Sequence, residues 1–396
     1  MKRLIYFFFL LSTLSLSAQT IEDALRFSQF GVGGTARTVA IGGAIGALGG
    51  DFSVISTNPA GLGIYQASEF TMTPSFFLSS VDAELADGGQ GAIEDNNTNF
   101  NFNNIGIVFG KKVNNKRSKW RTSNFSIGIN RLANFNESIT YNGVTTGSFA
   151  DFFQEQSTGL LPSELNDFDT GLAFDVGAIF DLELDRFYET DVELVPGAPI
   201  QKDQTINRSG SINELVFGLG GFRGDKLMLG VTLGIPIASF TESSVYNESD
   251  TEDDLIPFYN SLSFTQDLDI SGFGLNLKVG AIYIVSKAVR VGAAIHTPTR
   301  FRLTEEFQTS LVYDFTDDGA GNDGALEASS PTDPGDYDIK TPWRFIGSGA
   351  VLIKRLGFIS AEVEYINYGS ASFRDCLLYT SPSPRDATLS RMPSSA

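Results

Sequence analysis

The feature that most constrains this chain is a two-residue alternation of side chains, which is longest in residues 289–303. The odd positions there are Val289, Val291, Ala293, Ile295, Thr297, Thr299, Phe301 and Leu303. The even positions are Arg290, Gly292, Ala294, His296, Pro298, Arg300 and Arg302. Successive side chains of a β-strand point to opposite faces of its sheet. One face of this strand is therefore predicted to be mainly apolar, and the other to carry three arginines and the only histidine.

The same division recurs in residues 227–237, 275–285 and 359–365. Their polar face is rich in glycine and small polar residues, as in a lumen wall, and their apolar face is continuous, as beside lipid. A soluble sandwich also alternates, but its apolar face turns inward. Segments such as 262–285 are also far longer than the usual soluble strand of about 5–6 residues. The pattern favours an all-β transmembrane antiparallel barrel over a soluble sandwich.

Nine strands are expected, and their connections alternate in character. The strands are predicted near 69–79, 104–113, 122–142, 205–222, 227–243, 262–285, 288–314, 339–354 and 357–373. Every second connection is short and mostly basic, as in residues 113–121. The others are long and acidic or polar: residues 314–338 hold eight acidic residues and no Lys or Arg. Short periplasmic turns and long outer loops are typical of outer-membrane barrels.

The first residues and the bulk composition narrow the location and the partners. Residues 1–18 combine Lys2 and Arg3 with an apolar run and small residues before Gln19, which predicts a cleaved signal peptide. A net charge of −19 argues against nucleic-acid binding. Cys376 is the only cysteine, so disulfides cannot organise the fold. These features predict an exported protein of the outer membrane.

Residues 31–63 form a glycine-rich, almost uncharged leader that ends in Asn58-Pro59-Ala60-Gly61. Pro59 fixes its own φ and biases Asn58 away from helix, and the Asn58 side chain can bond to its own backbone in a turn. One interpretation is a rigid turn leading into the first strand. The other is a plug inside the lumen whose movement opens a path. The sequence leaves both open.

At this point the chain resembles a known family. The patterns G-T-A-R-x-x-A-x-G-G-A, A-L-G-G-D and N-P-A-G, placed ahead of long alternating strands, are similar to those of the FadL/TodX-type outer-membrane transporters of hydrophobic compounds. The resemblance implies a 14-stranded barrel with an N-terminal hatch inside, of which about nine strands are present here. It implies passive uptake of long-chain fatty acids or other apolar molecules, with release sideways through the barrel wall. It carries the motif over to Asn58, Pro59, Ala60 and Gly61.

The expected partners follow from this architecture. They are hydrophobic small molecules, outer-membrane lipid and, by implication, the barrel-assembly machinery of a Gram-negative cell, with the protein itself a monomer. The long connection 143–204 holds apolar stretches. These stretches predict either helices that cover the outer rim or an apolar surface that a ligand meets first.

Arg290, Arg300 and Arg302 are candidates for holding a ligand carboxylate, since all three are predicted on the lumen face. The alternative is that they pair with Glu362 and Glu364. No catalytic set, metal site or cofactor is predicted, because the one histidine and one cysteine are too few. Two other functions stay open: a haem or nutrient receptor of the same shape, in which His296 takes part, and a structural or adhesive surface protein.

The domain organisation expected from these features has four parts. A signal peptide at 1–18 precedes a plug at 19–66 and a partial barrel at 67–374. Residues 375–396 change in composition, with three prolines, five serines and no alternation. This tail resembles translated adapter sequence at the end of a gene fragment and is predicted not to be native.

Overall fold

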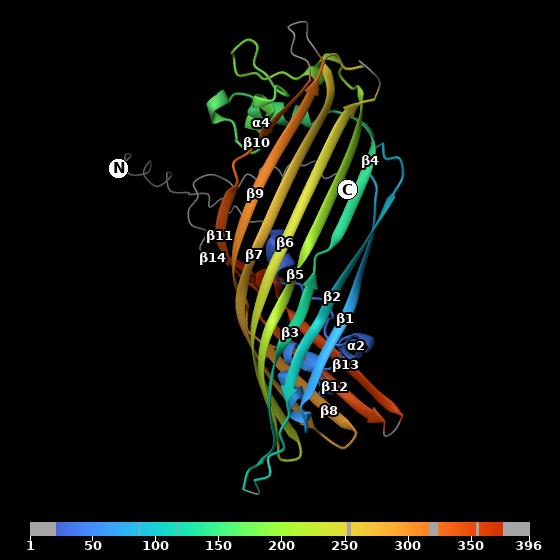
Figure 1. The fold of residues 1–396 in the computed structure, drawn as a ribbon, viewed down its shortest axis with the longest axis vertical. Helices are drawn as coiled ribbons and strands as arrows, with labels where there is room; N and C mark the ends of the chain where they lie inside the picture. The colour runs from blue at the N-terminus through green and yellow to red at the C-terminus, as the bar shows by residue number, and fades with distance from the viewer. Residues whose placement is uncertain are drawn as a thin grey trace, which may run out of the picture.

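The computed structural model describes residues 21–374 except 87, 116, 252–254, 317–323 and 354–355. The predicted signal peptide at 1–18 and the predicted non-native tail at 375–396 lie outside the described residues. The described chain forms one sheet of 14 strands, with antiparallel pairing throughout, that is long and curved (Figure 1). The predicted all-β, antiparallel fold is confirmed.

The strands are β1 (Glu69–Ala83), β2 (Ile93–Phe109), β3 (Trp120–Asn134), β4 (Glu137–Thr146), β5 (Pro199–Arg223), β6 (Leu227–Asp250), β7 (Tyr259–Ile284), β8 (Val289–His296), β9 (Arg300–Phe315), β10 (Gly324–Ser329), β11 (Asp333–Lys340), β12 (Arg344–Ile353), β13 (Gly357–Ile366) and β14 (Ser372–Arg374). The α-helices are α1 (Ile21–Arg26), α2 (Ala36–Ala40), α3 (Phe149–Ser157) and α4 (Thr170–Asp175). Five 3-10 turns are η1 (Phe52–Ser56), η2 (Pro59–Ile64), η3 (Pro162–Glu164), η4 (Asp191–Leu194) and η5 (Tyr368–Ser370). None of the described helices is long and apolar enough to cross a membrane.

The strand order is β1-β2-β3-β5-β6-β7-β8-β12-β13, with shorter strands attached beside this path. Strand β7 is long enough to pair with β8 along its C-terminal part and with β9 along its N-terminal part. Within the described residues, β1 and β13 each have a neighbour on one side only, so the sheet is not closed.

Fourteen strands replace the nine expected because four predicted strands, 122–142, 288–314, 339–354 and 357–373, each divide in two, and because β10 forms where a loop was expected. The predicted strand 288–314 divides into β8 and β9 around Pro298, and the predicted strand 339–354 divides around Pro342. Proline has no backbone N–H to donate to a strand ladder. Thr341 N donates to Thr299 O at 2.9 Å, which sets Pro298 and Pro342 opposite each other at the interruption.

Two predicted boundaries are also wrong. Residues 314–338, expected as an acidic loop, contain β10 and most of β11, both of which pair with β9. The asparagine-rich residues 94–103, left outside the predicted strands, belong to β2. Asparagine has a low β-propensity, but pairing with β1, with one register shift between Thr73 and Pro74, stabilises the strand here.

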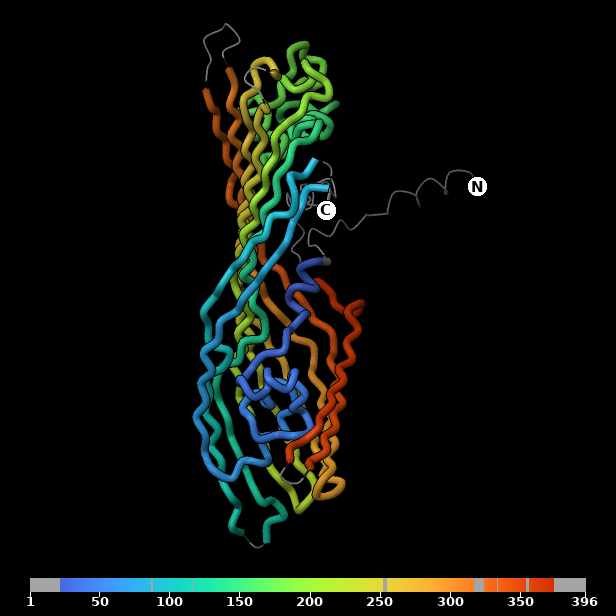
Figure 2. Tube along the Cα trace, turned by 90° about the vertical axis from the view of Figure 1, so that its right-hand side faces the viewer, coloured from blue at the N-terminus to red at the C-terminus, as the bar shows by residue number. Residues whose placement is uncertain are grey.

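The N-terminal segment, residues 21–66, lies in the curve of the lower half of the sheet (Figure 2). Its apolar side chains Phe52, Ile55 and Leu62 are fully buried in a core that also contains Val108 and Val216 of the strands. The segment is thus packed against the inner face of the sheet by burial of aliphatic and aromatic surface.

The two faces of the sheet exchange chemical character partway along the strands, most clearly in β7. The outward side chains of its lower half are Phe273, Leu275, Leu277, Val279, Ala281 and Tyr283, whereas those of its upper half are Ser261, Ser263, Thr265, Asp267, Asp269 and Ser271. The inward side chains change in the opposite sense: Leu268 and Ile270 are buried above, and Asn276 and Lys278 are buried below. The lower half agrees with the faces predicted for residues 275–285, and the upper half, whose faces were not predicted, shows the opposite arrangement.

Candidate functional site

Asn58 and Pro59 bring the N-terminal segment directly against the sheet. Asn58 is the N-cap of η2, and its Oδ1 accepts a hydrogen bond from Ala60 N at 3.2 Å. Its Nδ2 donates to Gly46 O at 2.7 Å and to Ala281 O of β7 at 3.3 Å. Asn58 is fully buried, so one side chain joins the turn, the preceding loop and a strand.

A row of strand glycines makes room for this turn. Gly220, Gly230 and Gly280 are register partners on β5, β6 and β7. A Cβ on Gly230 would lie 2.2 Å from Pro59 O, and one on Gly280 would lie 2.0 Å from Asn58 Oδ1. Glycine is therefore required because the two backbones approach each other too closely for any side chain.

Polar side chains of the sheet bind backbone groups of the N-terminal segment. Arg290 Nη1 donates to Leu48 O at 2.7 Å, and Glu362 Oε2 accepts from Gly46 N at 2.8 Å. His296 Nε2 lies 2.6 Å from Thr57 O. Irregular buried backbone needs hydrogen-bond partners, and here the strands supply them.

A buried ion pair lies level with His296, because Lys278 pairs with His296 in the register of β7 and β8. Lys278 Nζ of β7 donates to Glu214 Oε2 of β5, and Asn276 Nδ2 donates to Glu214 Oε1 at 3.0 Å. Ser56 Oγ of η1 donates to the same carboxylate at 3.0 Å and accepts from Asn130 Nδ2 at 2.8 Å. The Glu214 carboxylate therefore links three strands to the N-terminal segment. The cost of burying these charged and polar groups is offset by the hydrogen bonds and the ion pair that they form with one another.

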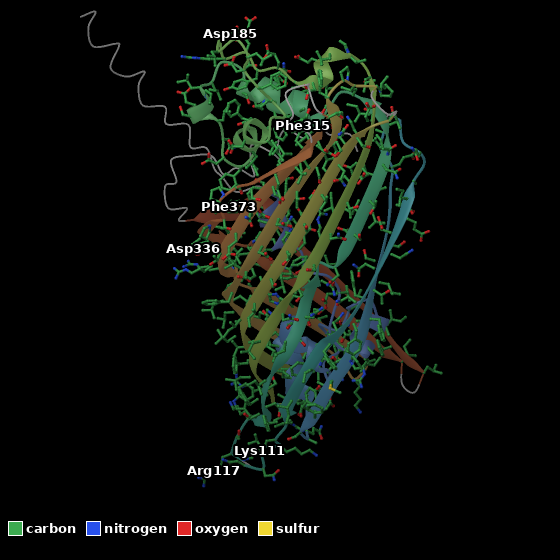
Figure 3. All side chains as sticks on the ribbon, turned by 45° about the horizontal axis from the view of Figure 1, so that its top comes forward. Lys111, Arg117, Asp185, Phe315, Asp336 and Phe373 are labelled. Carbon is green, nitrogen blue, oxygen red and sulfur yellow. The ribbon has the colours of Figure 1, made fainter. Side chains whose placement is uncertain are left out.

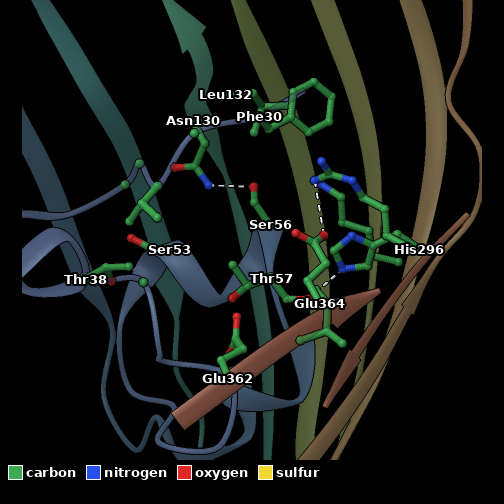
Figure 4. A pocket seen from close by; sticks show the side chains of 18 of the residues that line it. Phe30, Thr38, Ser53, Ser56, Thr57, Asn130, Leu132, His296, Glu362 and Glu364 are labelled. Atoms are coloured by element: carbon green, nitrogen blue, oxygen red, sulfur yellow. Dashed lines mark hydrogen bonds and ion pairs between the residues drawn. The ribbon is translucent and has the colours of Figure 1, made fainter. Parts of the chain in front are cut away.

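A cavity of about 270 Å³ separates the N-terminal segment from β7, β8, β12 and β13 (Figure 4). Its lining combines polar side chains, among them Lys278, His296 and Glu362, with apolar ones such as Phe30 and Leu132. The cavity thus presents both polar and apolar surface.

Arg344 and Glu364 stand at one side of this cavity. Arg344 Nη1 lies 3.4 Å from Glu364 Oε1, and Nη2 donates to Ser28 O at 3.2 Å. The Arg344 guanidinium also lies 4.4 Å from the ring centroid of Phe30. One cation therefore holds the start of β12 against the beginning of the N-terminal segment.

The three arginines predicted to share the lumen face do not do so. Arg290 points inward, but Arg300 and Arg302 are exposed on the outer face, while Phe301 and Leu303 between and after them are buried. Lys278 pairs with His296 and Leu275 with Arg300, so the register on β7 shifts by one residue between β8 and β9. A shift of one residue turns every following side chain to the other face.

The alternative expectation was that these arginines pair with Glu362 and Glu364. No ion pair of this kind is found among the described residues. Arg290 binds Leu48 O, and Arg302 lies 3.6 Å from Asp338. Glu364 instead meets Arg344, a residue that sequence reasoning did not single out.

The strand interruption around Pro298 and Pro342 has hollows on both faces. On the inner face, Thr297, Thr299, Thr341 and Pro342 line the cavity. On the outer face is a hollow of about 490 Å³ lined by Ile295, Trp343, Phe345, Tyr365, Asn367 and Ser370. The inner cavity and the outer hollow therefore lie on opposite faces of the sheet at the same strand interruption.

Above the cavity, buried apolar clusters follow the inner faces of β7 and β9. The nearer cluster joins Leu268 and Ile270 of β7 with Phe301 and Leu303 of β9 and with Phe27 of α1. The farther cluster joins the upper ends of the same strands with the outer subdomain, residues 147–198. An apolar interior therefore extends from the outer subdomain to the N-terminal segment.

The outer subdomain combines a buried core with exposed apolar residues. Phe149 and Phe153 of α3 pack against Phe264 of β7. Burial raises the pKa of the Tyr188 phenol, whose hydroxyl donates to Leu160 O at 3.2 Å. The expected helices cover the outer end of the sheet, and exposed apolar side chains accompany them: Leu182, Leu184, Phe187 and Leu194.

Some of this site could have been found in the sequence. The glycines at 220, 230 and 280 were visible as polar-face glycines, and strand pairing would have put them in one row. Glu214 and Lys278 gave no such signal, since their contact depends on strands far apart in the chain. Among the described residues, no group of three or more His, Cys, Asp or Glu could hold a metal ion.

The fold and the site together define an open antiparallel sheet curved around an N-terminal segment that is bound to its inner face. No protein-family model and no curated protein matches the chain. Among solved structures, the crystal structure of the Pseudomonas putida toluene transporter TodX is similar at 11% sequence identity. The similarity covers 88% of this chain and 74% of that chain, with a TM-score of 0.44. A likeness at this level does not assign a family.

Proposed function

We propose that this protein is an outer-membrane channel for passive uptake of hydrophobic molecules such as long-chain fatty acids. The observation that carries the proposal is the exchange of faces along β7. An apolar outer face combined with a polar interior suits lipid outside and a bound N-terminal segment inside. A polar outer face combined with an apolar interior suits water outside and a hydrophobic solute inside.

The dimensions support placement in a membrane. The apolar outer stretch of β7 runs over residues 273–283, and that of β6 runs over residues 227–237. Ile237 pairs with Phe273, and Leu227 pairs with Tyr283, so both stretches begin and end at the same levels. A tilted strand needs about 9–11 residues to cross a bilayer, which is the height of this apolar band.

The interior supports capture of a hydrophobic solute. A fatty acyl chain gains about 0.8 kcal/mol for each CH₂ group removed from water. Exposed apolar residues of the outer subdomain, such as Leu184 and Phe187, offer a first contact. The buried clusters along β7 and β9 offer a second apolar environment nearer the cavity. Passage between such sites needs no external energy source.

The N-terminal segment is proposed to act as a plug and the strand interruption as the lateral exit. The contacts of Asn58, Arg290 and Glu362 hold the segment across the interior. At the interruption, the inner cavity and the outer hollow lie on opposite faces of the same strands. Movement of the segment would connect them, and a hydrophobic solute would then leave directly into lipid.

A disulfide lock tests the plug. A Cβ on Gly46 would lie 2.9 Å from Ser348 Oγ of β12, a separation compatible with a disulfide between Gly46→Cys and Ser348→Cys. Cells producing this variant in a Cys376→Ser background are assayed for uptake of radiolabelled oleate. Oxidation is expected to stop uptake and dithiothreitol to restore it, whereas the Gly46→Cys single variant should not respond.

The outcomes separate the parts of the proposal. Uptake that survives oxidation would contradict plug gating but leave transport intact. Absence of uptake by the unmodified protein, with the protein present and folded in the outer membrane, would contradict transport. A role for His296 in haem capture gains no support, because its ring is buried against Thr57 O.

A further inference from the structure

The lower end of the sheet carries a rim of exposed cations. They lie in the short connections β2–β3, β5–β6 and β7–β8 and at the adjoining strand ends, and Figure 3 labels two of them at that end. We call this set the basic rim: Lys111, Lys112, Arg117, Lys119, Arg121, Arg223, Lys226 and Lys287, all of them exposed.

Most of these cations have no carboxylate partner within the described residues. The one ion pair in the rim joins Arg121 to Asp225. The nearby Glu69 is engaged with the Tyr65 hydroxyl at 3.3 Å. The basic rim therefore carries a clear excess of positive charge that the protein itself does not neutralise.

The basic rim is continuous with the lower edge of the apolar band. Leu227 pairs with Tyr283 at that edge, and Lys226 precedes Leu227 directly. Lys226 Nζ lies 6.0 Å from the ring centroid of Tyr283, and Trp120 is 39% exposed beside Lys119. Exposed aromatics between an apolar band and polar groups are typical of a membrane interface.

The opposite end of the molecule has the opposite charge. Residues 181–193 of the outer subdomain contain six acidic residues and only Arg186 as a cation. Since the whole chain has a net charge of −19, the basic rim is not a reflection of overall composition. The surface potential is therefore polarised along the axis of the strands.

We infer that the basic rim binds the phosphate groups of anionic phospholipids at the membrane surface on the side of the short turns. Lys and Arg side chains close to an anionic membrane surface are attracted to it electrostatically. The rim lies at the depth at which the apolar band meets lipid headgroups, and its cations lack competing carboxylates. The inference rests on the membrane placement in the proposed function, but not on transport.

The test measures lipid enrichment. The full chain is reconstituted into vesicles of phosphatidylglycerol and phosphatidylcholine in equal amounts and extracted mildly, and the two lipids that remain bound are quantified by mass spectrometry. We expect the bound lipid to be enriched severalfold in phosphatidylglycerol. The enrichment should be lost in the Lys226→Glu/Lys287→Glu variant and in 0.5 M NaCl.

A matched variant controls for charge alone. Arg186→Glu reverses the charge of an exposed residue of the outer subdomain, at the end of the molecule opposite the rim, and should keep the enrichment that Lys226→Glu alone reduces. Bound lipid at the bulk ratio, or equal loss in both variants, would overturn the inference while leaving fatty-acid uptake unaffected. Failure of the protein to float with phosphatidylcholine vesicles would overturn the membrane placement as well.

Discussion

Below and above the level at which Ile237 pairs with Phe273, the same strands bury different chemistry. Below it, β7 turns Asn276 and Lys278 toward the N-terminal segment and leaves Leu277 exposed. Above it, β7 turns Leu268 inward and leaves Asp269 exposed. The strand itself continues without a break, so the change lies only in the side chains.

The difference shows that the surroundings, and not the backbone, decide which face is apolar. In the lower half, buried polar groups can stay inside because the N-terminal segment offers backbone partners, as Thr57 O does for His296. In the upper half, Phe27 of the same segment and the outer subdomain fill the interior with apolar side chains instead. The predictions below test each side of this comparison.

The largest loss of stability is expected when a charge is placed in the apolar band. Leu277→Arg puts a cation near its middle, where an arginine costs about 2–4 kcal/mol in a bilayer. Ser271→Arg makes the same change on the same face of β7 but above the band. Guanidinium unfolding in phosphatidylcholine vesicles should show a large loss for the first variant only. Equal losses would place the band elsewhere.

The next largest loss of stability is expected when a side chain on the sheet is made to clash with the turn at Pro59. Gly230→Val brings a Cβ to 2.2 Å from Pro59 O, and overpacking of this kind costs about 1–3 kcal/mol. Limited proteolysis should then cleave residues 31–63 faster. Gly347→Val is the control, because a Cβ there would meet nothing within 4 Å. Unchanged protection in Gly230→Val would show that the segment is not held at this row.

A smaller difference in stability is expected between alanine substitutions of two arginines that were predicted on one strand. Arg290→Ala removes a donor to Leu48 O and should lower the unfolding free energy by about 1.5 kcal/mol, typical of a charged hydrogen bond. Arg302→Ala removes an ion pair with Asp338 in which the Arg302 side chain is 75% exposed. The expected loss of unfolding free energy is about 0.5 kcal/mol or less. Chemical denaturation of both variants measures the difference. A greater loss in Arg302→Ala would contradict the reversal of faces at β9.

The smallest effect concerns the apolar interior of the upper half. Leu303→Asn replaces a buried side chain of β9 with a polar one, and a loss of about 1 kcal/mol of solute binding lowers occupancy about fivefold. Oleate uptake should fall by a similar factor. Thr304→Asn, the neighbouring position on the other face, should leave uptake unchanged. If both variants transport equally, the solute does not pass along the inner face of β9.

Much of the lower half could be predicted from the sequence. Residues 227–237 and 275–285 alternate without interruption, and the structure exposes the face that the pattern indicated. Local geometry at Asn58 and Pro59 followed from the conformational limits of those two residues. In both cases the information lies within a few neighbouring residues.

The upper half could not be predicted in the same way. The alternation in 289–303 continues through Pro298, yet the register on β7 shifts there, and only the pairing of Leu275 with Arg300 reveals it. Likewise, residues 94–103 become a strand because β1 lies beside them. Pairing between strands is a non-local property, and composition within one segment does not contain it.

The one-residue shift at Pro298 also restricts insertions and deletions in this part of the gene. Removing or adding a single codon among those for Thr297, Pro298 and Thr299 would turn every side chain of β9 around. Arg300 and Arg302 would then be driven into the interior, and Phe301 and Leu303 into water. The length of this short segment is thus constrained more tightly than its composition. Codon deletions should therefore be rejected there more strongly than substitutions of single residues.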